Sequence, residues 1–261
     1  MLLLRTHNLQ LTTPLTHDLP FRIALAALLG LVAAAGNVIG GYFVVRGEWP
    51  RKYLEYFVAL GAGYMLTVAF VEVIPESIRL GGENALLFVL VGYFLIHLFE
   101  HTLAPHFHFG EETHPAEIHG FHARNTILLG LAIHTFFDGV AIAAGFLVST
   151  WLGTIIFLAV FLHKLPEGFT VASVVLASGK GKASAVRAAA LLGAATLAGV
   201  LLTSQLQGEL KYALPLAGGV TVYVAATDLL PEVNREPNWR MAVLVFGGVA
   251  ILLTLHYLFR V

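Results

Sequence analysis

Residues 125–177 read NTILLGLAIHTFFDGVAIAAGFLVSTWLGTIIFLAVFLHKLPEGFTVASVVLA, and this stretch decides the fold. Two apolar runs meet at Ser149-Thr150, and each exceeds the roughly 20 residues that a helix needs to cross a bilayer. Both runs carry a polar motif of the form His-x-x-x-(Asp/Glu)-Gly: His134-Thr-Phe-Phe-Asp138-Gly139, and 29 residues later His163-Lys-Leu-Pro-Glu167-Gly168. The stretch therefore predicts a tight antiparallel pair of membrane-spanning helices with matched polar groups.

The composition of the whole chain agrees with a membrane protein. Of the 261 residues, 57% are apolar and 12% are charged, whereas soluble domains carry about 25% charged residues. The formal net charge of −1 provides no basic surface for nucleic acid. Cysteine is absent, which excludes disulfides and thiolate metal sites. The 12 histidines, set against 15 Lys plus Arg, are the first indication of metal chemistry.

Eight windows are apolar and long enough to span a membrane, and the breaks between them leave no room for a soluble domain. The windows are residues 21–45, 53–78, 84–104, 125–148, 151–177, 185–206, 211–231 and 240–259. We therefore expect an all-α polytopic protein with one transporter domain over residues 1–261. Its central hairpin covers residues 125–177, and its longest loop covers residues 105–123.

The loops on one side of the predicted helices carry nine Lys and Arg residues, and the other side, including both termini, carries five. The more cationic loops usually face the cytoplasm. This count predicts extracytoplasmic termini in a multi-pass protein of the cell membrane, the inner or plasma membrane.

The second and seventh windows end alike. A shift of 156 residues superimposes Val71-Glu-Val-Ile-Pro-Glu76 on Thr227-Asp-Leu-Leu-Pro-Glu232. Because the two helices would run in opposite directions, this match predicts an inverted repeat with a 3+2+3 arrangement of spans, as in many secondary transporters.

The two central motifs place a His and a carboxylate four residues apart on one helix face. Counted from the turn, all four groups lie ~17–26 Å along their helices, near the middle of a ~30 Å hydrocarbon layer. Two imidazoles and two carboxylates form a ligand set for Zn(II), Fe(II) or Mn(II). We therefore expect His134, Asp138, His163 and Glu167 to bind a divalent metal.

A purely structural interpretation stays open at this point. Lys164 can form salt bridges with Asp138 and Glu167, capped by the two histidines. However, a charged group at the bilayer centre costs about 2.5–3.5 kcal/mol, and two matched motifs at equal depth favour a functional site. Pro166 also frees the carbonyl of Leu162, and such helix breaks are typical of transport sites.

With these motifs the sequence resembles the ZIP family of zinc and iron transporters, over all eight spans. The shared features are the histidine-rich loop, the two central motifs and the Leu-Pro-Glu ending of the seventh span. The resemblance implies uptake of divalent metal into the cytoplasm, with the same four residues as primary ligands. It also implies a homodimer and an elevator-like motion of spans one, four, five and six against the others.

Two positions depart from the family pattern. Thr135 stands where many members have Asn, and Lys164 stands where many have a carboxylate or an amide. In members with two adjacent metals, these positions help to hold the second ion. A lysine ammonium has no lone pair for a metal, so we expect a single metal ion. As a hypothesis, Lys164 balances the charge of the empty site.

Further polar groups are candidates for the transport pathway, although polar residues at helix ends are an equally ordinary interpretation. They are Glu72, Glu76, His97, Glu100, His101, Asp228 and Glu232. The loop histidines are His106, His108, His114, His119 and His122, and we expect weak metal buffering or sensing there. His7, His17 and His256 are interpreted as structural or surface residues.

A membrane-embedded zinc hydrolase is the alternative function. Such an enzyme keeps an open coordination position for water, whereas four ligands can close the shell here, and no His-Glu-x-x-His motif is present. A metal sensor is a third option, but it explains neither the repeat nor Pro166. We expect no enzyme activity and no cofactor. The metal is the substrate, with Zn(II) first and Fe(II), Mn(II) and Cd(II) left open.

Overall fold

The computed structural model describes residues 18–47, 51–102, 121–235 and 238–259, and within these ranges the regular structure is helical. Eight helices are long and apolar enough to cross a membrane. Each predicted window falls on one of them, which confirms the all-α polytopic prediction. The windows differ from the helices only at their ends, by up to four residues, and the seventh span begins earlier than predicted with a short 3-10 turn.

The described helices follow one another along the chain. In chain order they are α1 (Leu19–Arg46), α2 (Arg51–Val68), η1 (Ala69–Val73), α3 (Ile74–Gly81), α4 (Ala85–Thr102), α5 (Phe121–Val148), α6 (Thr150–Ala177), α7 (Lys182–Gln205), η3 (Gln207–Glu209), α8 (Leu210–Tyr223), η4 (Val224–Leu229), α9 (Leu230–Val233) and α10 (Trp239–Phe259). Only Ser149 separates α5 from α6, and its hydroxyl caps α6 by accepting the N–H of Leu152.

The second and seventh spans each contain a π-helical turn, η1 and η4, which sequence analysis did not anticipate. The N–H of Ile74 bonds to the carbonyl of Ala69, and 156 residues later the N–H of Leu230 bonds to that of Ala225. A proline follows directly in both places, and a wide turn accommodates the ring and the missing N–H of proline. The sequence similarity of the two spans thus extends to their backbone.

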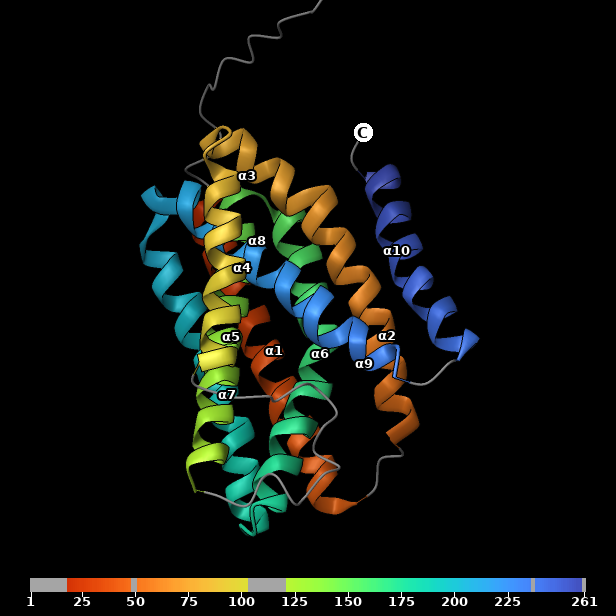
Figure 1. The fold of residues 1–261 in the computed structure, drawn as a ribbon. Coiled ribbons are helices and arrows are strands. Elements are labelled where there is room, and N and C mark those ends of the chain that lie inside the picture. Colours follow the sequence, from red (N-terminus) through yellow and green to blue (C-terminus); the bar gives the residue numbers. More distant parts are fainter. Residues whose placement is uncertain (1–17, 48–50, 103–120, 236–237, 260–261) are drawn as a thin grey trace, which may run out of the picture.

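The helices pack as two groups. The first group is α1, α5, α6 and α7, which contact one another; in the second group, α2 packs on α10 and α4 packs on α8. The groups meet mainly where α2 packs on α6 and α5 packs on α8. Figure 1 shows α1 beginning and α10 ending on the same side of the bundle, and the first group extending further toward the opposite side.

Close backbone contact joins α1 to α6. A Cβ atom on Gly168 would lie 2.0 Å from the carbonyl oxygen of Asn37, and one on Gly40 would lie 2.2 Å from that of Leu165. Only glycine permits this approach. The side chain of Arg22 anchors the other end of α1, because its Nη1 donates to the carbonyl of Val148 at 3.0 Å.

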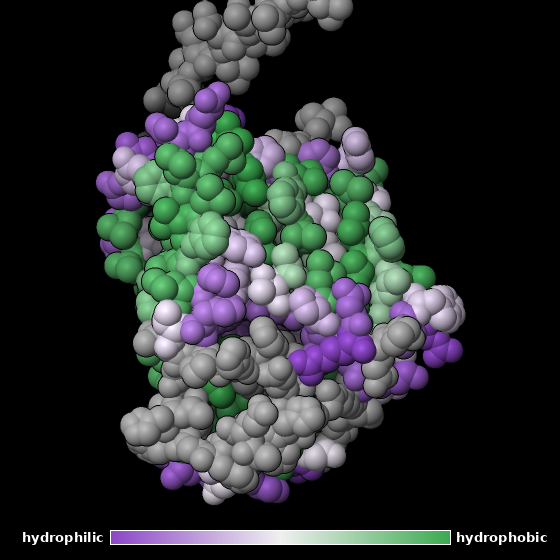
Figure 2. All heavy atoms as spheres, in the orientation of Figure 1, coloured by the Kyte–Doolittle hydropathy of each residue, from purple (hydrophilic) through white to green (hydrophobic). Residues whose placement is uncertain are grey.

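The outside of the bundle is apolar. Figure 2 shows hydrophobic side chains over much of the face that carries α4 and α10, with hydrophilic side chains gathered below them. The span α10 is the least buried, with 11% of its most apolar window inside the protein, against 72% for α6. The central hairpin is therefore the interior of the protein, and α10 lies at its periphery.

Candidate metal centre

The four predicted ligands come together at the centre of the hairpin. One ligand atom from each of His134, Asp138, His163 and Glu167 can be chosen so that all four lie within 4.8 Å of one another. All four residues are at most 2% exposed. His134 and Asp138 project from α5, and His163 and Glu167 project from α6, because each pair is four residues apart on one helix face.

Both imidazoles direct Nε2 at the same carboxylate oxygen. The Nε2 atoms of His134 and His163 each lie 3.2 Å from Oδ2 of Asp138. Nδ1 of His163 lies 3.0 Å from the carbonyl oxygen of Ala159, which can only accept a hydrogen bond. Nδ1 of His163 therefore donates to this carbonyl, which orients the ring and directs Nε2 at the site. Nε2 of His134 is buried without a hydrogen bond.

These distances suit a shared metal ion. Two ligands at 2.0–2.1 Å from a tetrahedral zinc ion are about 3.3 Å apart, close to the 3.2 Å that separates each Nε2 from Oδ2. Each Nε2 that gives up its proton can bind a cation placed beside Oδ2 of Asp138. The donor set therefore fits a divalent transition metal.

Lys164 supplies the positive charge of the site. Its Nζ lies 2.6 Å from Oδ2 of Asp138 and 2.5 Å from Oε2 of Glu167, and the side chain is fully buried. The hydroxyl of Thr135 donates to Oε1 of Glu167. The salt bridges considered in the structural interpretation are thus present, in the same cluster as the two imidazoles.

On the side where α5 meets α6, Glu72 is buried in η1 and 3% exposed. Nδ1 of His256 lies 2.7 Å from its Oε1, and the indole Nε1 of Trp151 donates to the same oxygen at 3.4 Å. The sequence indicates only a structural or surface role for His256 and gives no sign of this pair, which joins residues 184 apart in sequence. Glu76 instead pairs with Arg79 of its own helix.

On the opposite side, Asp228 is buried in η4 and interacts electrostatically with Glu100 and with His134. The hydroxyl of Tyr223 donates to Oε2 of Glu100 at 2.8 Å. Asp228 is thus within electrostatic range of Glu100 and of the central residue His134. Tyr223 was missed, because nothing in the local sequence marks a tyrosine as the partner of a distant carboxylate.

The remaining pathway candidates lie further out. His97 and His101 are exposed, with ring centroids 4.0 Å apart on one face of α4. Glu232 pairs with Arg235 at 2.9 Å. His7, His17, His106, His108, His114 and His119 lie outside the described residues, as does the side chain of His122.

Comparison with known proteins assigns the family. A family model described as "ZIP Zinc transporter" matches residues 111–256, more than half of the chain. The chain belongs to the ZIP zinc transporter family. The match contains both halves of the His/carboxylate cluster, and it makes the chain a multi-pass membrane protein of a metal-transporting family, not of an enzyme family.

Individual relatives of the ZIP family extend this match. The chain is 29% identical to the zinc transporter ZupT of Enterobacter sp. (strain 638) over 254 residues, which cover 88% of this chain and 95% of that protein. It is 24% identical to the zinc transporter ZIP9-B of Xenopus laevis, over 80% of this chain and 84% of the relative. It is 32% identical to the rat zinc transporter SLC39A7 over 48% of this chain, but only 30% of that longer protein.

Proposed function

We propose that this ZIP-family chain carries divalent transition-metal ions, with Zn(II) as the main substrate, into the cytoplasm through a single site at the centre of the hairpin. One observation carries the proposal: two imidazole nitrogens and two carboxylates converge within 4.8 Å inside membrane-spanning helices. A cation at this depth needs protein ligands in place of its hydration shell. Relatives named as zinc transporters support the choice of metal.

His134, Asp138, His163 and Glu167 are the proposed ligands. Asp138 is central among them, because both Nε2 atoms and the ammonium of Lys164 surround its Oδ2. Its oxygen becomes a metal ligand when the ion enters between the two imidazoles.

Lys164 keeps the site mononuclear and balances its charge when empty. The ammonium occupies the space between the two carboxylates that a second ion would need. When the metal binds, the flexible lysine stem lets Nζ withdraw, and positive charge stays beside the carboxylates in both states. The hydroxyl of Thr135 orients Glu167 in this arrangement.

The movement that we propose is elevator-like: the first helix group, which contains all four ligands, slides against the second group. The separate packing of the groups supports this motion. The paired π-helical turns, η1 and η4, support the 3+2+3 inverted repeat. The whole chain would act as one transporter domain with extracytoplasmic termini in the cell membrane, as a homodimer.

The proposed pathway runs past the two buried carboxylates of the π-helical turns. Glu72 lies on the side of the termini, with Glu76 nearer the end of the span, and would receive the incoming ion. On the other side, Asp228 is within electrostatic range of His134 and of Glu100, and these two carboxylates would take the ion toward His97, His101 and Glu232. The hydrolase alternative is not retained, because the family is one of transporters.

Uptake of radioactive zinc into sealed proteoliposomes tests this function. We expect saturable uptake by the unmodified chain, and loss of uptake in the double variant His134→Ala/Glu167→Ala. Glu83→Ala, an exposed carboxylate outside the site, is the control and should transport normally. Competition by iron, manganese and cadmium ranks the substrates. Tight zinc binding without uptake in demonstrably sealed vesicles would reject transport.

A further inference from the structure

Trp151 connects the two helix groups on the side where α5 meets α6. It lies in the first turn of α6, in the first group, and its indole Nε1 donates to Oε1 of Glu72 in the second group at 3.4 Å. Its ring also lies 5.8 Å from that of Phe259 on α10. One side chain of the first group thus contacts two elements of the second group.

His256 holds Glu72 in place for this contact. Its Nδ1 lies 2.7 Å from the same Oε1, so α10 fixes the carboxylate from one side while Trp151 approaches from α6. Glu72 is 3% exposed, and a buried charge with fixed partners cannot turn to solvent without breaking them. The contact is therefore positioned by three helices, of which only α6 belongs to the first group.

This contact lies well away from the central site along the helix axes, toward the side of the termini. Because α2 and α6 pack antiparallel, the separation can be counted on both helices. A Cβ atom on Gly61 would touch Leu162 of α6, next to His163, while Glu72 meets Trp151. Gly61 and Glu72 are 11 residues apart on one span, and Trp151 and Leu162 are 11 residues apart on the other. This separation is about 16 Å at 1.5 Å per residue.

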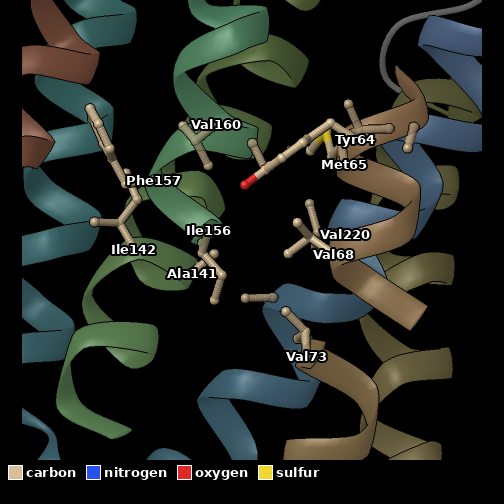
Figure 3. Packing of buried hydrophobic residues seen from close by; sticks show 14 of the residues in the cluster. Tyr64, Met65, Val68, Val73, Ala141, Ile142, Ile156, Phe157, Val160 and Val220 are labelled. Atoms are coloured by element: carbon tan, nitrogen blue, oxygen red, sulfur yellow. The ribbon is translucent and has the colours of Figure 1, made fainter. Parts of the chain in front are cut away.

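An apolar layer fills the distance between the contact and the site. Figure 3 shows Met65 and Val68 of α2 facing Ile156 and Val160 of α6, and all four belong to one buried hydrophobic cluster. Tyr64 extends into this layer, and its hydroxyl is buried without a hydrogen bond. An ion cannot pass such a layer, so the central site is closed toward this side.

We propose that Glu72, Trp151 and His256 form a latch that keeps the central site closed toward the side of the termini and that opens when the first group moves. Glu72 and Trp151 are positioning residues for transport. The inference rests on the proposed function. Asp228, 156 residues from Glu72, provides the contrast, because it lies on the opposite side, within electrostatic range of the site residue His134. The contact between Trp151 and Glu72 is therefore formed on the side toward which the central site is closed.

Cysteine accessibility tests the latch, because the chain has no cysteine of its own. Ala141→Cys places one thiol in the apolar layer, at a residue 4% exposed. A membrane-impermeant, cationic methanethiosulfonate is added to full-length protein in sealed vesicles. Thr150→Cys and Lys180→Cys, in exposed turns at opposite ends of α6, establish which side the reagent reaches.

We expect slow labelling of Ala141→Cys from the Thr150 side. Labelling should accelerate about three- to tenfold in Trp151→Phe, as expected for loss of one hydrogen bond. This change keeps an aromatic ring at the position and removes the indole N–H. Glu72→Ala should give at least the same acceleration. Glu83→Ala is the control, since it removes an exposed carboxylate that follows α3 and lies outside the contact, and it should leave the rate unchanged.

Unchanged labelling in Trp151→Phe and Glu72→Ala would overturn the latch, and so would equal acceleration in Glu83→Ala, which indicates general loosening. Val160→Cys repeats the measurement from α6 if Ala141→Cys does not fold. Failure of the transport function would instead appear as no zinc uptake by the unmodified chain, whereas failure of the latch alone leaves a chain that transports zinc.

Discussion

Replacing Lys164 by methionine removes one positive charge from the centre of the site and keeps an unbranched side chain of similar length. Nζ lies 2.6 Å from Oδ2 of Asp138, and a bound metal ion would lie about 2.1 Å from that oxygen. The two cations are then at most about 5 Å apart. With an effective dielectric constant of about 20, unit charges at that distance repel by about 3 kcal/mol, and a dication and an ammonium by about 6 kcal/mol.

Two effects reduce this repulsion in the protein. The lysine side chain can withdraw from the ion, and in Lys164→Met one carboxylate can take up a proton that the metal must displace. We therefore expect zinc to bind at least tenfold more tightly to Lys164→Met, which corresponds to about 1.4 kcal/mol. Maximal uptake should fall, because the empty site would carry two carboxylates without a buried cation during its return.

Titration calorimetry of the purified protein measures the zinc dissociation constant, and proteoliposome uptake measures the maximal rate. Lys180→Met, in an exposed turn, is the control for loss of a cation from the chain. A dissociation constant within twofold of the unmodified protein, together with unchanged uptake, would refute the charge-balancing role.

Three further changes test the packing and the site. Gly168→Ala brings a methyl group to 2.0 Å from the carbonyl oxygen of Asn37, so we expect α1 to separate from α6, and folded protein and uptake to be lost. Arg22→Ala removes the donor to the carbonyl of Val148. The free energy of unfolding should fall by about 1–3 kcal/mol, so the melting temperature in detergent should fall, while the affinity for zinc stays the same. Thr135→Val removes a hydroxyl that orients a ligand carboxylate, and KM for zinc should rise about three- to tenfold.

Each of these variants has a matched control at an exposed or unconstrained position. Gly181→Ala adds a methyl group where nothing lies within 4 Å. Arg187→Ala and Thr154→Val remove side chains of the same type that bond only within their own helices. Normal folding of Gly168→Ala, an unchanged melting temperature in Arg22→Ala, or an unchanged KM in Thr135→Val would contradict the corresponding contact.

The helices and the central cluster could be predicted from the sequence because their signals are local. Apolar length defines a span, and a His four residues from a carboxylate defines a face on a single helix. The turn at Ser149 then fixes how the two faces meet. No long-range information was needed to bring His134 near His163.

Contacts between distant spans could not be predicted in this way. The pairing of His256 with Glu72 joins residues 184 apart, and that of Tyr223 with Glu100 joins residues 123 apart. Such pairs depend on helix rotation and packing, which the periodicity of an almost wholly apolar helix hardly constrains. Arg22 likewise entered the sequence argument only as a charge in a loop count.

X-ray absorption at the zinc edge, combined with metal analysis of the purified protein, tests the central claim most directly. We expect one zinc ion per chain, bound by two imidazole nitrogens and carboxylate oxygens at about 2.0–2.2 Å, and loss of this signal in His134→Ala/Glu167→Ala. Two zinc ions per chain with a metal–metal vector, or an unchanged spectrum in the double variant, would contradict a single ion held by His134, Asp138, His163 and Glu167.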